Sequence, residues 1–165
     1  MNRLDVEAIR ADAEGRGVLT AGEAVPVGVT LPGVVREGVM RTAANVDAEW
    51  IGTDAAALLR GVVGAPCLVV NDADAAGVAE AAFGEVRGLS GTTLVLTFGT
   101  GIGSALVFDG MLVPNFELGH LELDGYPDIE RHASAKVIER EGIALEEWAA
   151  RAARYIAHLE HVMNP

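Results

Sequence analysis

The chain has 165 residues, half of them hydrophobic and only 5% aromatic, and its 24 acidic residues against 12 basic ones give a formal net charge of −12. This balance argues against non-specific nucleic-acid binding and against attraction to an anionic membrane surface. A single cysteine excludes an internal disulfide and a cysteine-rich zinc site. The N-terminus lacks the apolar region of a signal peptide, and no run approaches the roughly 20 apolar residues of a membrane span. We therefore expect a cytoplasmic globular protein.

The spacing of apolar residues predicts both helices and strands in the first half of the chain. Thr53 or Asp54 is expected to cap the second helix, because both side chains can accept hydrogen bonds from first-turn N–H groups. Cys67 opens a short apolar run and is expected to pack as a small hydrophobic residue. In chain order, the expected elements are a helix over 4–13, a strand over 25–31, a hairpin around 36–38, a helix over 54–63 and a strand over 67–70.

The second half of the chain combines a pair of strands with further helices. A strand followed directly by a helix at residue 70, with hairpins elsewhere, indicates an α/β fold. In chain order, the expected elements are an alanine-rich helix over 73–86, strands over 92–98 and 104–108, a turn at 109–110 leading into 111–112, and helices over 128–140 and 145–163.

The most informative stretch is residues 96–104, where an apolar β-branched run passes into glycines at alternate positions, 99, 101 and 103. Glycine lets backbone N–H groups approach an oxyanion closely, and the Thr100 hydroxyl adds another donor. No Gly-Lys-Ser/Thr follows, and the G-x-G-x-x-G spacing is absent, so neither a Walker loop nor a dinucleotide-binding fingerprint is present. Two interpretations are open at this point: a phosphate clasp between two strands, or a glycine-rich hairpin made for packing.

Asn71-Asp72-Ala73-Asp74 lies where a buried strand is expected to end and a helix to begin. Ligands of open α/β sheets gather at the carboxyl ends of strands, and a carboxylate there can accept a proton from a bound hydroxyl. The alternative is helix capping, which suits Asp74 better than Asp72 because Asp74 lies further into the helix start.

Glu117-Leu118-Gly119-His120 places a carboxylate and an imidazole close together. Such a pair can bind the hydroxyls of a sugar, which need both donors and acceptors, but for the motif taken alone a surface turn is the favoured interpretation. Glu122 extends the cluster or is a solvated position, and Asn45 is placed to stabilise a turn.

Two further groups of polar residues suggest weaker hypotheses. His158 and His161, beside Glu160, have helical spacing but no additional ligand at a familiar distance, so surface positions are favoured over a metal site. Arg131, Lys136 and Arg140 on one expected helix are candidates for a polyphosphate-binding track, although a solvated helical face is the favoured interpretation.

Four motifs occur in order along the chain: T-A-A-N-V-D-x-x-W-I-G-T, N-D-A-D-A-A-G, L-T-F-G-T-G-I-G-S-A and P-N-x-E-x-G-H-L-E. Together they closely resemble the ROK family of sugar kinases and, within it, the polyphosphate glucokinases of actinobacteria. The resemblance implies an α/β, actin-like (ribonuclease H-like) two-lobed fold, here incomplete, with sugar and phosphoryl donor in the cleft. It divides the chain into residues 1–90, the remainder of the N-terminal lobe, and 91–165, the first part of the C-terminal lobe.

The resemblance also implies a role for each matched residue. Asp72 matches the catalytic base that takes the proton from the sugar 6-hydroxyl. The residues matched to sugar binding are Asn45, Asn71, Glu117, His120 and Glu130. The residues matched to the second phosphate motif are Gly99, Thr100, Gly101 and Gly103.

The implied partners are glucose and a phosphoryl donor, polyphosphate or ATP, used with Mg²⁺. No zinc is expected, because the cysteine cluster that many relatives carry between His120 and Glu130 is missing, as in the polyphosphate-using branch. No residue is assigned as a protein metal ligand, no nucleic-acid or membrane partner is expected, and the full-length form is expected to be a homodimer.

Two family motifs are absent from this sequence: the initial Asp-x-Gly-Gly-Ser/Thr turn and a later Gly-Gly-Gly turn, both at the donor site. The chain is therefore expected to be a truncated form of a polyphosphate/ATP-dependent glucokinase. Two alternatives stay open. One is a non-catalytic remnant that at most binds sugar, and the other is the sugar-sensing part of a ROK regulator.

Overall fold

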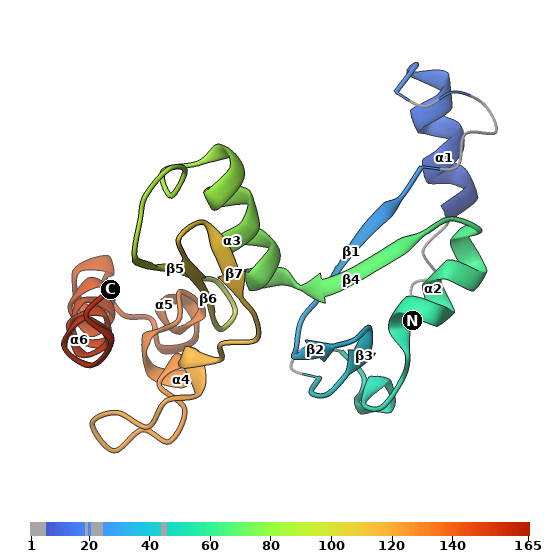
Figure 1. The fold of residues 1–165 in the computed structure, drawn as a ribbon. Helices are drawn as coiled ribbons and strands as arrows, with labels where there is room; N and C mark the ends of the chain where they lie inside the picture. Colours follow the sequence, from blue (N-terminus) through green and yellow to red (C-terminus); the bar gives the residue numbers. More distant parts are fainter. Residues whose placement is uncertain (1–5, 19, 21–24, 44–45) are drawn as a thin grey trace. The chain divides into compact units, whose positions relative to one another are not determined.

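The computed structural model describes residues 6–18, 20, 25–43 and 46–165, which form two compact units, Met1–Asn71 and Asp72–Pro165 (Figure 1). The family resemblance predicts a different boundary, between residues 90 and 91, and that boundary stays a prediction. Within the described part of the chain, no helix combines the length and apolar character needed to cross a membrane.

The first unit contains two parallel strands with a helix against them. β1 and β4 pair in parallel, with Val27 opposite Cys67 and Leu31 opposite Asn71. The expected hairpin forms between β2 and β3, and both residues of its turn, Glu37 and Gly38, have positive φ. The elements of this unit are α1 (Val6–Gly15), β1 (Val27–Leu31), β2 (Val35–Arg36), β3 (Val39–Met40), η1 (Ala48–Trp50), α2 (Ala55–Val63) and β4 (Cys67–Asn71).

Short-range chemistry explains these elements well. Asp54 caps α2, because its side chain accepts a hydrogen bond from the Ala57 N–H at 2.8 Å. Gly64 ends the same helix in the left-handed conformation. Cys67 is a buried free thiol in the core cluster with Met40 and Val69, which confirms its predicted packing role.

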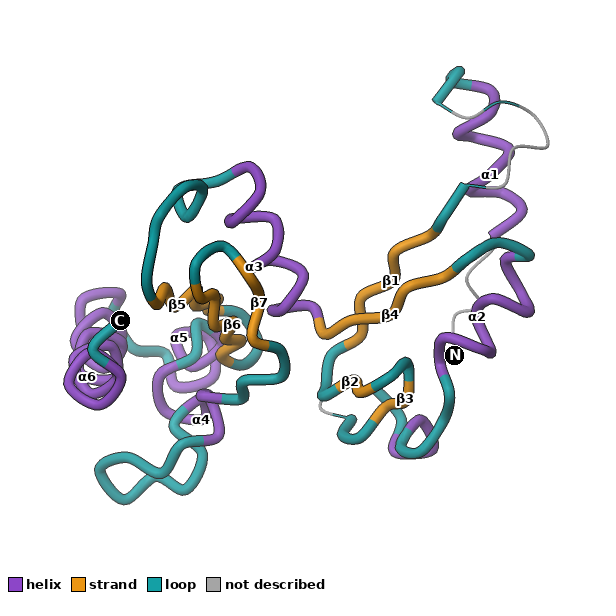
Figure 2. Tube along the Cα trace, viewed as in Figure 1, coloured by secondary structure: helices purple, strands orange, loops and turns teal. Residues whose placement is uncertain are grey.

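The second unit is a three-stranded antiparallel sheet between helices (Figure 2). β5 pairs with β6 along its whole length, from Thr92 opposite Phe108 to Phe98 opposite Ile102, and β7 extends the sheet beyond β6. The elements are α3 (Asp72–Phe83), β5 (Thr92–Phe98), β6 (Ile102–Phe108), β7 (Met111–Val113), η2 (Leu118–His120), α4 (Glu130–Ala133), α5 (Lys136–Glu141) and α6 (Leu145–Met163).

The two faces of this sheet are covered by different helices. Ala105 and Val107 point toward α3, whose Gly77 lets the helix approach the sheet closely. Alternate residues point the other way, and there Ile102 joins a core cluster with Tyr155 and Leu159 of α6. One strand, β6, therefore contributes side chains to both layers of the unit.

Several expected boundaries are wrong. The strand predicted over 25–31 begins at Val27, and the helix predicted over 4–13 continues to Gly15. The helix predicted over 128–140 is two short helices, because the chain is extended at Ser134 and the Lys136 N–H donates to the Gly99 carbonyl at 3.0 Å instead of continuing one helix. The strand predicted from residue 104 begins at Ile102, since ladder pairing with β5 continues to the glycines. The helix predicted over 73–86 begins at Asp72 and ends at Phe83, before Gly84.

Candidate functional site

The glycine turn, residues 99–103, closes the β5–β6 hairpin at one end of the second unit's sheet. The Gly99 N–H donates to the Gly101 carbonyl at 3.0 Å, whereas the N–H groups of Thr100 and Gly101 donate to no other described residue. Gly99 and Thr100 are exposed. Two backbone donors and a hydroxyl are therefore available together, which is the donor set that an oxyanion requires.

Asp72 lies at the same end of the sheet, because the start of α3 packs directly on Gly103. A Cβ at Gly103 would lie only 2.8 Å from the Ala73 Cβ, so only glycine allows this approach. The Asp72 side chain is exposed, and its Oδ1 accepts a hydrogen bond from the Ala73 N–H at 2.9 Å. Its carboxylate thus stands at the helix start, beside the glycine turn.

Asp74, for which helix capping was one interpretation, contacts a segment far away in the sequence. Its buried carboxylate accepts hydrogen bonds from the Asn115 N–H, at 3.0 Å to Oδ2 and 3.3 Å to Oδ1. Burial raises the pKa of Asp74, and the neighbouring charge of Asp72 raises it further. Asp74 therefore ties α3 to the segment of residues 114–120, which we call the acceptor loop.

In the acceptor loop, the backbone on both sides of Glu117 is hydrogen-bonded to one hydroxyl group. Ser104 Oγ donates to the Phe116 carbonyl at 2.7 Å and accepts from the Leu118 N–H at 3.0 Å. The Oε1 atom of Glu117 is buried and accepts no hydrogen bond from the described residues. Burial raises the pKa of Glu117, and the neighbouring charges of Asp74, Asp72 and Glu130 raise it further. A buried carboxylate oxygen without a donor is a suitable acceptor for a ligand hydroxyl.

His120 stands between two carboxylates. Its Nδ1 lies 3.2 Å from Asp128 Oδ1, and its Nε2 lies 3.9 Å from Glu117 Oε2. The ring is half exposed. Glu117 and His120 are thus brought together as the motif predicted.

Glu130 connects the glycine turn to the acceptor loop. Its Oε2 accepts a hydrogen bond from the Ile102 N–H at 3.1 Å. A Cβ at Gly101 would clash with this carboxylate, and one at Gly119 would lie 3.1 Å from it. The absence of side chains at these two glycines therefore makes room for Glu130.

The match to a known protein family covers most of the chain. Residues 18–142 match the ROK family. The chain belongs to the ROK family.

Individual ROK relatives are closely similar. A polyphosphate glucokinase of Mycobacterium leprae (strain TN) is 45% identical over 145 residues, covering 87% of this chain and 44% of that protein. A polyphosphate glucokinase of Mycobacterium tuberculosis (strain ATCC 25618 / H37Rv) is 45% identical over 141 residues, covering 85% and 53%. The crystal structure of the inorganic polyphosphate/ATP-glucomannokinase from Arthrobacter sp. strain KM matches with a TM-score of 0.86 and 48% identity, over 97% of this chain and 64% of that one.

These similarities confirm the expected family and the actin-like sugar kinase fold class. The chain spans about half the length of the curated relatives it matches.

Two further residues are matched to the ROK sugar site, Asn45 and Asn71. Asn45 lies outside the described residues. Asn71 is the last residue of β4 in the first unit, where its buried amide donates to the Gly33 carbonyl at 3.0 Å.

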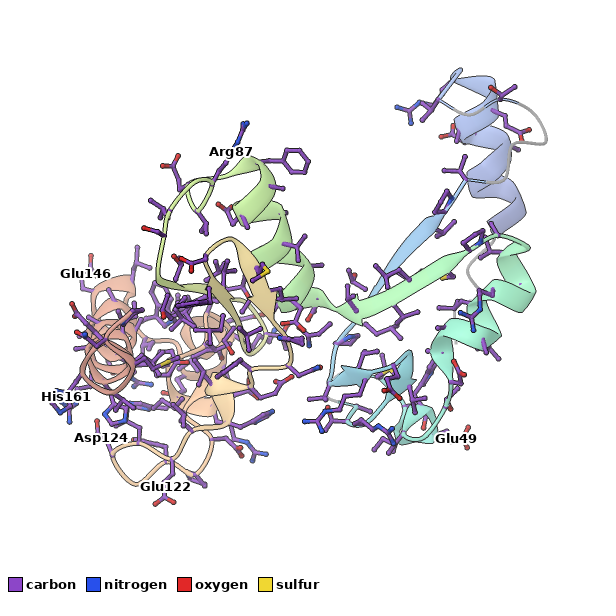
Figure 3. The ribbon with its side chains drawn as sticks, viewed as in Figure 1. Glu49, Arg87, Glu122, Asp124, Glu146 and His161 are labelled. Atoms are coloured by element: carbon purple, nitrogen blue, oxygen red, sulfur yellow. The ribbon has the colours of Figure 1, made fainter. Side chains whose placement is uncertain are left out.

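Several of the weaker candidates occupy the surface. Glu122 and His161 are exposed, on the loop before α4 and near the end of α6 (Figure 3). No group of three or more potential ligands for a metal ion occurs among the described His, Cys, Asp and Glu residues. The proposed basic track is divided between α4 and α5, and each cation has an acidic partner: Arg131 with Asp128, Lys136 with Glu139, and Arg140 with Glu141.

Sequence reasoning missed Ser104 and Asp128 altogether and did not find the contact of Asp74 with Asn115. A signal for Ser104 was present, because it is the polar residue in the alternation Ile102, Ser104, Leu106 along one face of β6. Asp128 carried no such signal, since its contact with His120 depends on the path of the loop between them.

Proposed function

We propose that this chain carries the sugar-binding and base-bearing part of a polyphosphate/ATP-dependent glucokinase, which transfers a phosphoryl group to the 6-hydroxyl of glucose. The observation that carries the proposal is the buried Oε1 of Glu117, which has no donor among the described residues and lies in the same unit as Asp72 and the glycine turn. The similarity to polyphosphate glucokinases supports the substrate and donor.

In this proposal Asp72 is the general base. Its exposed carboxylate at the start of α3 accepts the proton of the attacking hydroxyl, which makes the oxygen a better nucleophile. Phosphoryl transfer otherwise requires mainly alignment and charge stabilisation.

The other matched residues bind the two substrates. Glu117 and His120 hold sugar hydroxyls, with Asn45, Asn71 and Glu130 contributing as the family resemblance implies. The open N–H groups of the glycine turn and the Thr100 hydroxyl receive donor phosphate oxygens, because they are hydrogen-bond donors on adjacent residues of one turn.

Mg²⁺ usually takes only one or two carboxylates and completes its shell with phosphates and water. In this proposal the donor phosphates and water would therefore supply most of the ligands. When bound, the ion would neutralise charge on the phosphates. Cytoplasmic location and a homodimeric full-length form are supported by the family resemblance alone.

A second candidate is sugar binding without turnover. It is the alternative that the sequence motifs leave open for these 165 residues. The two candidates share the sugar site and differ in whether the donor site works.

Calorimetric titration with glucose, run beside a coupled assay for glucose 6-phosphate with polyphosphate or ATP, separates these candidates. Binding with turnover supports the kinase, binding without turnover supports the second candidate, and no binding contradicts both. Asp72→Asn is expected to lower any turnover by about 10²- to 10⁴-fold while glucose affinity stays within about twofold. Glu122→Gln, at an exposed position of the same unit, is the matched control and should change neither. Near-normal turnover of Asp72→Asn would show that Asp72 is not the base.

A further inference from the structure

His120 is held by a carboxylate outside the sequence motifs. Its Nδ1 is 3.2 Å from Asp128 Oδ1, within hydrogen-bond distance, while its Nε2 is 3.9 Å from Glu117 Oε2, beyond it. Among the described residues, Asp128 therefore makes the ring's hydrogen bond. The other ring nitrogen is left beside Glu117, the residue with the unpartnered buried oxygen.

Asp128 is itself fixed from a second side. Arg131 Nε lies 3.2 Å from Asp128 Oδ2, and the Arg131 N–H donates to the Asp128 carbonyl at 3.0 Å. One carboxylate oxygen thus faces the imidazole and the other faces a guanidinium. Rotating the Asp128 side chain would break at least one of these contacts, so its orientation is defined at the start of α4.

We propose that Asp128 is a positioning residue of the sugar site, which keeps the neutral His120 ring protonated on Nδ1 and presents Nε2 beside Glu117 as a hydrogen-bond acceptor. A carboxylate can only accept, so a neutral ring bonded to it must donate from Nδ1. The inference rests on the proposed function for the identity of the ligand.

The consequence is a site with two neighbouring acceptors. Nε2 of His120 carries a lone pair, and Oε1 of Glu117 is a carboxylate oxygen without a donor. Such a pair favours a ligand that offers two donating hydroxyls, as a sugar diol does, because each acceptor then gains a partner. If the proton moved to Nε2, one acceptor would become a donor and the match would be lost.

The first test needs no ligand. The ¹⁵N shifts of the His120 ring would be recorded at about pH 8, where imidazole is normally neutral, in the whole chain and in Asp128→Asn. Asparagine keeps the size of aspartate, but its amide can donate to Nδ1, so the variant should gain the Nε2–H tautomer. Asp124→Asn is the matched control, because Asp124 is an exposed carboxylate of the same loop that pairs with Arg154 and not with His120. The wild-type chain and this control should both show the Nδ1–H tautomer.

The second test is glucose affinity by calorimetry on the same three proteins, with equal unfolding midpoints as the folding check. Asp128→Asn should bind glucose about tenfold more weakly, and Asp124→Asn should bind as wild type. An unchanged tautomer in Asp128→Asn, or a changed tautomer with unchanged affinity, overturns the positioning role. Absence of glucose binding by the wild-type chain overturns the proposed function instead. The tautomers would still show whether Asp128 determines which nitrogen of the His120 ring carries the proton.

Discussion

The glycine turn and the acceptor loop lie in the same unit and are built in opposite ways. In the turn, missing side chains create the site, because they leave backbone N–H groups open and let Ala73 and Glu130 approach. In the loop, additional side chains create the site, because Ser104 and Asp74 fix the backbone around Glu117. The N–H donors of the turn therefore depend on glycines, which have no side chain, whereas the acceptors of the loop depend on neighbouring side chains that hold the loop backbone in place.

Within the glycine turn, the effect of an added methyl group should depend on how closely each glycine is packed. In Gly103→Ala the new Cβ would lie 2.5 Å from Thr97 Oγ1 and 2.8 Å from the Ala73 Cβ, so we expect a loss of about 2–3 kcal/mol in the free energy of unfolding. Gly99→Ala meets nothing within 4 Å and should stay within about 0.5 kcal/mol of wild type. Urea unfolding measures both, and equal values for the two variants would contradict the role given to close packing at Gly103.

The acceptor loop should respond to loss of its supporting hydroxyl. Ser104→Ala leaves the Phe116 carbonyl and the Leu118 N–H without their partner, which we expect to lower the free energy of unfolding by about 1–2 kcal/mol and to weaken glucose binding. Ser90→Ala, at an exposed position, is the control and should change neither. Wild-type glucose affinity in Ser104→Ala would show that the loop keeps its shape without the hydroxyl.

The smallest effect concerns the pH dependence of stability. Burial raises the pKa of Glu117 above 4.5, so its favourable contribution is present below that value and disappears as the pH rises through the raised pKa. Glu117→Gln does not titrate, and its stability relative to wild type should therefore increase between about pH 4 and pH 7, by at most about 1 kcal/mol since the side chain is partly solvated. Urea unfolding across this range measures the difference, and a flat or decreasing difference would contradict burial as the cause.

The sequence predicted those parts of the fold that depend on neighbouring residues. The Asp54 cap, the Glu37-Gly38 turn and the strand over 92–98 follow from local chemistry, and the structure confirms all three. The break at Ser134 was not predictable in this way, because it depends on the hydrogen bond from Lys136 to Gly99, a residue far away in the chain.

The same distinction applies to the site. Short motifs identified Glu117, His120 and the glycines, because each group is contiguous in the sequence. The contacts that hold them in place were missed: Asp74 contacts Asn115, and Ser104 contacts the two neighbours of Glu117. Such contacts join segments that only the folded sheet brings together, so periodicity carries no direct sign of them.

The most direct test of the account is a glucose titration of the wild-type chain, Glu117→Gln and Glu122→Gln by calorimetry. We expect saturable binding by the wild type and by Glu122→Gln, whose substitution lies at an exposed position, and at least about tenfold weaker binding by Glu117→Gln. Equal affinity in all three proteins, or no binding by the wild type, would contradict it.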